Sequence, residues 1–187
     1  MLGGRLMQHH DDLLLRYRKL VSRLAEIPKR MVALYDLESN GSIPEYILHD
    51  LCHEDCFNLK KAAFLIDNPD FDLLKGIAGF SKDERFNDNH WNVPDKFNQH
   101  MNSSLFNQKV KSYCECSPKR NQKKYEDQLE KVAIELNLHK PAFKVWPMKH
   151  YNHGFLLYER ELDEADEIFE DNFLSSLHIL SFCPVNK

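Results

Sequence analysis

The chain has 187 residues, of which 42% are hydrophobic and 29% are charged, and it carries a net charge of −4. That length and that hydrophobic content are enough for one domain with a core that needs no disulfide bonds. The acidic balance argues against a nucleic-acid-binding protein and against attachment to an anionic membrane surface.

The cysteines indicate the compartment. There are five of them, an odd number, and the first ten residues lack the apolar stretch of a secretory signal. No apolar run approaches the length of a membrane span. We therefore expect a cytoplasmic protein whose thiols are free or bound to metal rather than paired in disulfides.

Hydrophobic periodicity predicts a single α+β domain over residues 1–187, with about five helices and two β-hairpins that form a small antiparallel sheet. Residues 1–10 are predicted to be a flexible N-terminus. Residues 11–37 are predicted to form a long amphipathic helix that packs against the core or, alternatively, mediates dimerisation. Pro28 is expected to bend or split that helix.

The remaining elements follow in chain order. Helices are predicted at 44–57, 94–113, 122–136 and 162–180, and strands at 62–66, 71–80, 143–146 and 154–159. The first hairpin is expected to turn at 67–70. Gly76 and Gly79 weaken its second strand, or mark a bulge or a close approach of another backbone segment.

A short internal repeat relates two parts of the chain. Asn58–Phe64 and Asn137–Phe143 match at five of seven positions, and each segment lies between a predicted helix and a predicted hairpin. The repeat predicts two helix-plus-hairpin units related by a pseudo-twofold axis.

The stretch from Tyr46 to Cys56 carries most of the reactive side chains. In a helix, successive residues are about 100° apart, so residues at i, i+3, i+4 and i+7 share one face. That face holds His49, Cys52, His53 and Cys56. Ile47, Leu48 and Leu51 occupy the opposite face, which predicts an apolar anchor behind a row of metal-competent groups.

His49 and His53 have the i, i+4 spacing that lets two imidazoles from one helix reach one metal ion. The string His49-Asp50-Leu51-Cys52-His53 resembles the His-Glu-x-x-His helix of zinc peptidases, in which the acidic residue activates water. Ile47-Leu48-His49-Asp50 also resembles the His-Asp dyad of HD-type metal phosphohydrolases, an all-helical family. Both resemblances imply metal-dependent hydrolysis.

A thiolate site is a third interpretation. Cys52 and Cys56 could join Cys114 and Cys116 around Zn²⁺ or in an iron–sulfur cluster. One tetrahedral ion cannot take all six His and Cys groups, so further ligands could come from His139, His150, His153 or a carboxylate.

The sequence thus favours a cytoplasmic metal-binding protein that binds Zn²⁺ or Fe, and a metal-dependent hydrolase in which Asp50 or Glu54 either supports the metal ligands or acts as the base. Two alternatives stay open for the residues 49–56. They could simply pack in the core, or Cys52 or Cys56 could be a nucleophile beside His53. The alternative function is a non-enzymatic protein-binding or chaperone-like adaptor that forms a homodimer.

Overall fold

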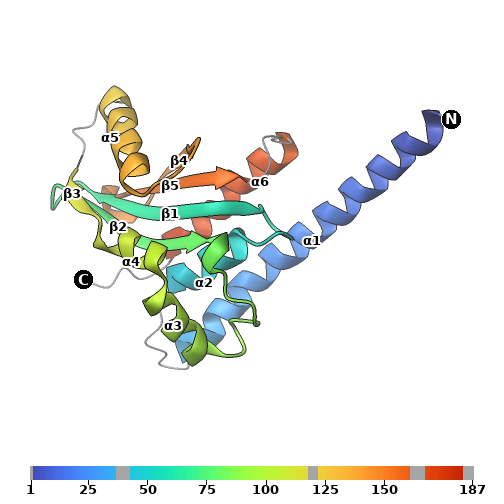
Figure 1. The fold of residues 1–187 in the computed structure, drawn as a ribbon, viewed down its shortest axis with the longest axis horizontal. Coiled ribbons are helices and arrows are strands. Elements are labelled where there is room, and N and C mark those ends of the chain that lie inside the picture. Colours follow the sequence, from blue (N-terminus) through green and yellow to red (C-terminus); the bar gives the residue numbers. More distant parts are fainter. Residues whose placement is uncertain (1, 37–42, 118–121, 161–166, 183–187) are drawn as a thin grey trace.

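The computed structural model describes residues 2–36, 43–117, 122–160 and 167–182, and the side chains of residues 13–34, 43–117, 125–160 and 172–182. In this part of the chain six α-helices surround one five-stranded antiparallel sheet, which confirms the predicted α+β class (Figure 1). The helices are α1 (Leu2–Asp36), α2 (Ile43–Leu51), α3 (Pro94–Ser103), α4 (Leu105–Ser112), α5 (Gln122–Glu135) and α6 (Glu167–Leu177). The strands are β1 (Leu59–Asn68), β2 (Leu73–Ser81), β3 (Cys114–Cys116), β4 (Ala142–Pro147) and β5 (His153–Arg160).

The sheet has the strand order β3-β2-β1-β5-β4, so the hairpins β1–β2 and β4–β5 meet through β1 and β5. This confirms the predicted pairing of two hairpins in one sheet. The first hairpin turns at 69–72, two residues later than predicted, and Asp72 there has a φ of 49°. Strand β3 was not predicted, because three residues are too few to show an alternating pattern.

Both faces of the sheet are buried. Ala62, Phe64 and Ile66 of β1 pack in the same apolar cluster as residues of α1, α2 and α6. Ala63 and Leu65 pack on the other face with residues of α4 and α5. A strand that is covered on both faces is apolar at consecutive positions, which is why β1 shows a continuous hydrophobic run rather than an alternation.

Helix α4 lies directly on β2. A Cβ atom at Gly76 would lie 1.8 Å from the carbonyl oxygen of Val110, and one at Gly79 would lie 2.8 Å from Val110 Cγ2. The structure shows the close approach at both glycines, and at Gly76 it also shows an irregularity, because the register of β1 with β2 shifts between Phe64 and Leu65. Asn107 Oδ1 accepts a 2.9 Å hydrogen bond from the Gly79 N–H, and Asn107 Nδ2 donates to buried Glu45 at 2.8 Å. These bonds tie α2, α4 and β2 together.

The predicted helix 94–113 is divided into α3 and α4 at Ser104. The Ser104 hydroxyl accepts a hydrogen bond from the N–H of Asn107 and caps the N-terminus of α4. A serine that caps in this way competes with continuation of the preceding helix. The periodicity is similar on both sides of the break, so it did not reveal the boundary.

Helix α1 begins at Leu2 and covers residues 11–36 of the predicted helix 11–37, whose last residue lies outside the described ranges. It continues through Pro28, so a split there was wrong and a bend stays a prediction. Its inner face is buried at Leu20, Ile27 and Met31. The N-terminal half extends away from the other elements (Figure 1). The flexibility predicted for residues 1–10 stays a prediction, as does the homodimer. No helix in the described ranges is long and apolar enough to cross a membrane.

The predicted pseudo-twofold axis is not confirmed. The central strands β1 and β5 are the first strand of one hairpin and the second strand of the other. The repeated segments nevertheless begin alike, since Asn58 and Asn137 have φ values of 47° and 54°. Asparagine tolerates this left-handed conformation better than most residues, so the two segments share the backbone conformation of their first residue.

Candidate functional site

Helix α2 ends at Leu51, six residues before the predicted end, and this changes the arrangement of the His/Cys face. Residues 52–57 form turns, in which the Phe57 N–H bonds to the Leu51 carbonyl at 3.1 Å and the Leu59 N–H to the Cys52 carbonyl at 3.2 Å. The prediction of one helix over 44–57 was therefore wrong. The four side chains divide into a cysteine pair that points inward and a histidine pair that reaches a surface cleft.

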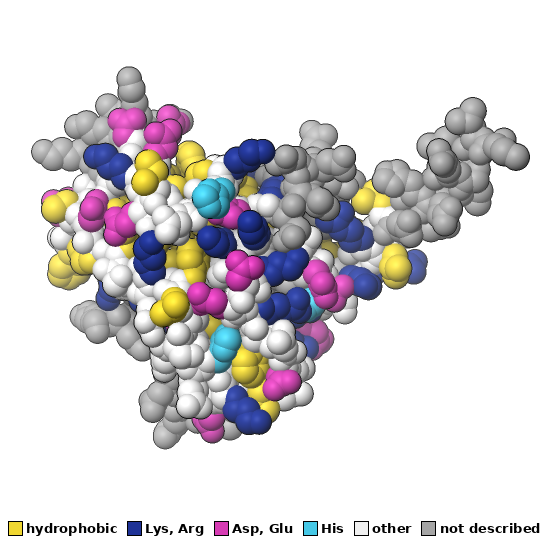
Figure 2. All heavy atoms as spheres, in the orientation of Figure 1, with side chains coloured by type: hydrophobic (Ala, Val, Ile, Leu, Met, Phe, Trp, Pro, Cys, Tyr) yellow, Lys and Arg dark blue, Asp and Glu magenta, His cyan; other side chains and the backbone are white. Residues whose placement is uncertain are grey.

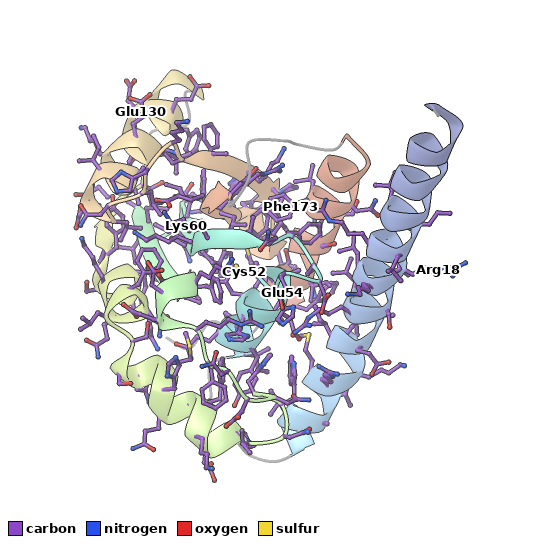
Figure 3. The ribbon with its side chains drawn as sticks, turned by 45° about the vertical axis from the view of Figure 1, so that its right-hand side comes forward. Arg18, Cys52, Glu54, Lys60, Glu130 and Phe173 are labelled. Atoms are coloured by element: carbon purple, nitrogen blue, oxygen red, sulfur yellow. The ribbon has the colours of Figure 1, made fainter. Side chains whose placement is uncertain are left out.

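Cys52 and Cys56 are 3% and 1% exposed and lie in the apolar cluster beneath the sheet. Figure 3 shows Cys52 in the interior, between α2 and β1. Burial raises the pKa of both thiols above the usual value, so they stay protonated at neutral pH. This environment is typical of cysteines that pack as small apolar residues.

Cys114 and Cys116 lie elsewhere, exposed on the edge strand β3. They pair with Lys75 and Leu73 of β2, whereas His49 contacts Phe80 near the other end of that strand. The structure therefore does not bring the two cysteine pairs together. Cys183 lies outside the described residues.

A cleft of about 580 Å³ opens between α1, the turn after α2, and the loop that follows β2. Its lining contains five Lys or Arg residues, three Asp or Glu residues and three histidines: Arg18, Lys19, Arg23, Arg30, Arg85, Glu26, Asp55, Asp88, His49, His53 and His90. Of the predicted site residues, His49 and His53 are in this lining. Glu54 is exposed on the turn beside the cleft and is not part of the lining.

Asp50 lies under the cleft and organises it. Its carboxylate is 0% exposed, and Oδ1 accepts hydrogen bonds from Arg23 Nε at 3.2 Å and Nη2 at 2.9 Å. Oδ2 accepts a 2.7 Å bond from the indole N–H of Trp91. One buried carboxylate thus joins α2 to α1 and to the loop after β2. These partners occupy both oxygens, so Asp50 positions Arg23 and Trp91 in this structure.

His49 and His90 form the floor of the cleft. Each is 3% exposed, and their ring centroids are 4.4 Å apart. Burial, followed by the neighbouring charge of His90, lowers the pKa of His49 to about 3. Burial, followed by the charges of Arg23 and Arg30, lowers the pKa of His90 to about 3. Both rings are therefore neutral at physiological pH.

The same two rings have nitrogens without hydrogen-bond partners. Among the described residues, nothing bonds to His49 Nδ1, His49 Nε2 or His90 Nε2. The nearest acid is Asp50, whose Oδ1 lies 3.6 Å from His90 Nε2, beyond hydrogen-bond range. Most buried polar atoms in folded proteins have partners, so three unpartnered nitrogens at the base of a cleft indicate a place where a ligand or water binds.

His53 lies higher in the cleft and has a defined tautomer. Its Nδ1 accepts a 3.1 Å hydrogen bond from the backbone N–H of Asp55, so the neutral ring carries its proton on Nε2. Burial, followed by the charge of Arg23, lowers the pKa of His53. To bind a metal through Nε2, this ring would have to give up the bond to Asp55, because metal-bound histidines donate from their other nitrogen.

Three arginines around the cleft form no ion pair with a described carboxylate, although Glu26, four residues before Arg30 on α1, interacts with Arg30 electrostatically. Within the described part of the chain, no carboxylate lies within ion-pair distance of Arg18, Arg30 or Arg85. The Arg85 Nε atom is buried without a partner, and the Arg30 guanidinium lies 5.9 Å from the centre of the Trp91 ring. Arg18 extends outward from α1 at the rim (Figure 3). Lys and Arg side chains gather where α1 meets the rest of the molecule (Figure 2).

The predicted metal centre does not assemble as a complete set. Over the side chains that the structure describes, no three His, Cys, Asp or Glu residues are grouped so that they could hold a metal ion. His49 and His53 do share the cleft, but the cysteines lie elsewhere. A metal site stays a prediction.

Sequence reasoning missed His90, Arg30 and Arg85. His90 and Trp91 are aromatic residues in the otherwise polar segment 81–94, and this contrast was the available signal. Nothing in the local sequence of Arg30 or Arg85 distinguishes them from surface residues.

Comparison with known proteins gives no assignment. No family model, no curated protein and no solved structure matches the chain. Function must therefore be argued from the cleft itself.

Proposed function

We propose that this protein binds a small organic anion, such as a phosphorylated metabolite, in the cleft between α1 and the loop after β2. The observation that carries this proposal is the combination of guanidinium groups without a carboxylate partner and buried imidazole nitrogens without a hydrogen-bond partner. An anion would supply the missing partner to the arginines, and the rest of the ligand would supply partners to the histidines.

The charge distribution favours an anion over a cation. The whole chain has a net charge of −4, yet Lys and Arg outnumber Asp and Glu by five to three around the cleft. Asp55 pairs with Lys19 at 3.1 Å and Glu26 with Lys29 at 2.8 Å, so no described carboxylate forms an ion pair with Arg30 or Arg85 in the lining. The planar guanidinium group suits bidentate contact with phosphate or carboxylate oxygens.

The size and the floor of the cleft define the rest of the ligand. A volume of about 580 Å³ lies within the range of small-molecule sites. A neutral imidazole has one donor and one acceptor nitrogen, so His49 can both give and receive a hydrogen bond. The ligand therefore combines an anionic group at the rim with a polar group, such as a hydroxyl or a ring nitrogen, that reaches the floor.

Calorimetric titration of the full chain with ATP, inorganic pyrophosphate and citrate tests this proposal. We expect saturable binding of at least one of these polyanions, with an affinity that falls as salt is added. Arg30→Gln and Arg85→Gln should each weaken binding by about ten- to a hundredfold, since a hydrogen bond to a charged group contributes about 1.5–3 kcal/mol.

Lys29→Gln is the matched control, because Lys29 is an exposed cation on α1 that pairs with Glu26 and does not line the cleft. It should bind like the wild type. Absence of saturable binding for all three compounds, or unchanged binding in Arg85→Gln, would refute the proposal.

A metal site is a second candidate, favoured by the neutral state of His49 and His90, since only a neutral imidazole can coordinate a metal. In this proposal Zn²⁺ or Fe would be held by His49 with His53 or His90 and would supply an activated water for hydrolysis. Asp50 would support the site through Arg23 and Trp91, since both of its oxygens already accept hydrogen bonds, and Glu54 could act as a base only after moving into the cleft.

Elemental analysis by mass spectrometry tests the metal candidate directly. If it is correct, protein purified without a histidine tag contains about one equivalent of Zn or Fe per chain. The double variant His49→Ala with His53→Ala should lose that metal, while Cys114→Ser with Cys116→Ser should retain it. Metal-free wild-type protein, after anaerobic purification and attempted reloading with Zn²⁺ and Fe²⁺, would exclude the site.

A further inference from the structure

A second concave surface lies on the other face of the sheet, between α5 and β4. This groove has a volume of about 470 Å³ and an apolar lining that includes Leu129, Ala133, Ile134 and Phe143. Ile134 is 76% exposed and Phe143 is 42% exposed. The groove shares no lining residue with the cleft at α1. Figure 3 places Glu130, at its rim, on the opposite side of the molecule from Arg18.

The groove borders an edge of the sheet along which no other described strand pairs. Strand β4 is the last strand in the order, and β5 is its only neighbour among the described strands. Alternate residues of such an edge strand direct their N–H and C=O groups away from the sheet, where another strand can pair with them. Phe143 and Val145 pair with Leu157 and Phe155 and lie on the α5 face, and Val145 is 39% exposed. An apolar strip therefore runs beside the open edge.

The rim of the groove is acidic. Glu126 and Glu130 line it one helical turn apart on α5, and no Lys or Arg is in its lining. Acidic side chains lie over α5, with hydrophobic side chains between α5 and β4 (Figure 2). These charges disfavour a symmetric pairing of two β4 edges, because a twofold axis there would bring two copies of Glu126 and Glu130 toward each other. They complement a basic partner instead.

We propose that the β4 edge and the α5 groove bind an extended, basic segment of a partner protein, which adds a strand next to β4. The segment has apolar side chains at alternate positions, which enter the groove beside Ile134 and Phe143. Lys or Arg side chains flank them and pair with Glu126 and Glu130. Backbone hydrogen bonds to β4 supply affinity, while the groove and its rim select the sequence.

Nuclear magnetic resonance titration of the isotope-labelled full chain with the capped peptide Lys-Thr-Val-Thr-Val-Thr-Lys tests the proposal. In this Lys-Val peptide the Lys and Val side chains all lie on the strand face that meets the groove and its acidic rim. We expect saturable shifts confined to the amides of β4 and the methyl groups of Ile134 and Leu129. Glu126→Gln with Glu130→Gln should weaken binding about fivefold, as expected for two exposed ion pairs. Ile134→Asp should abolish binding, and its exposure means that the fold is retained.

Two matched peptides separate the contribution of the acidic rim to binding from that of the added strand. A peptide with Glu in place of Lys tests the rim, and one with N-methylated residues on the pairing edge tests the added strand. Both should fail to bind. Absence of saturable shifts with the Lys-Val peptide, equal binding of the Glu-Val peptide, or shifts located away from β4 would overturn the proposal.

Discussion

Replacement of Asp50 by alanine is expected to lower the free energy of unfolding by about 3–5 kcal/mol, the usual effect of breaking a buried ion pair. Asp50 is fully buried and receives hydrogen bonds from Arg23 and from the indole of Trp91. Its removal leaves the Arg23 side chain, which is only 22% exposed, and the part-buried indole N–H of Trp91 without their acceptor. Urea unfolding followed by tryptophan fluorescence measures the effect, and Trp91 reports the local change directly.

Asp55→Ala is the matched control, because Asp55 also pairs with α1 but has a side chain that is 38% exposed. An exposed ion pair contributes about 1 kcal/mol or less, so this variant should be close to the wild type. Equal effects of the two substitutions would contradict the central role of Asp50.

Loss of stability in mild acid is the second large effect we expect. An unfolded histidine has a pKa of about 6.5, whereas burial lowers the pKa of His49 and His90 in the folded chain to about 3. Between these values the unfolded chain binds protons that the folded chain excludes. Stability is therefore full above pH 6.5 and falls as the pH drops toward 3, and the two residues together remove about 4 kcal/mol between pH 7.5 and pH 5.

Urea unfolding at a series of pH values between 7.5 and 4.5 measures this loss. His49→Leu removes one group that takes up a proton on unfolding. Between pH 3 and pH 6.5 the slope of the free energy of unfolding against pH should therefore decrease by about 1.4 kcal/mol per pH unit. At pH 7.5 this variant should be at least as stable as the wild type, because an apolar side chain replaces two unpartnered nitrogens. It should also bind the proposed anion more weakly. A pH-independent stability of the wild type would refute the linkage.

The architecture was largely predictable because it depends on periodicity over many residues. The buried stripe of α1 at Leu20, Ile27 and Met31 has helical spacing. The two hairpins are separated from the helices by clear turn residues. The end of α2 was not predictable in this way, because the apolar and His/Cys pattern continues past Leu51 into turns, where the Phe57 N–H bonds to the Leu51 carbonyl, without a change in hydrophobicity.

The candidate site was only partly predictable, because the fold assembles it from distant segments. Arg23 and Arg30 come from α1, His49 from α2, and Arg85 and His90 from the loop after β2. Sequence spacing can identify residues on one helix face, which is how His49 and His53 were found. It cannot show that an arginine 27 positions before Asp50 forms its ion pair.

The contact between α4 and β2 affects how sequences related to this chain should be interpreted. At positions 76 and 79 the backbone and side chain of Val110 occupy the space where a Cβ atom would lie. Any larger residue must move a helix that Asn107 and Glu45 also hold in place. Both positions would therefore remain glycine throughout evolution even though neither lines the cleft or the groove. Invariance there would report packing, whereas covariation among positions 30, 49, 85 and 90 would report the ligand.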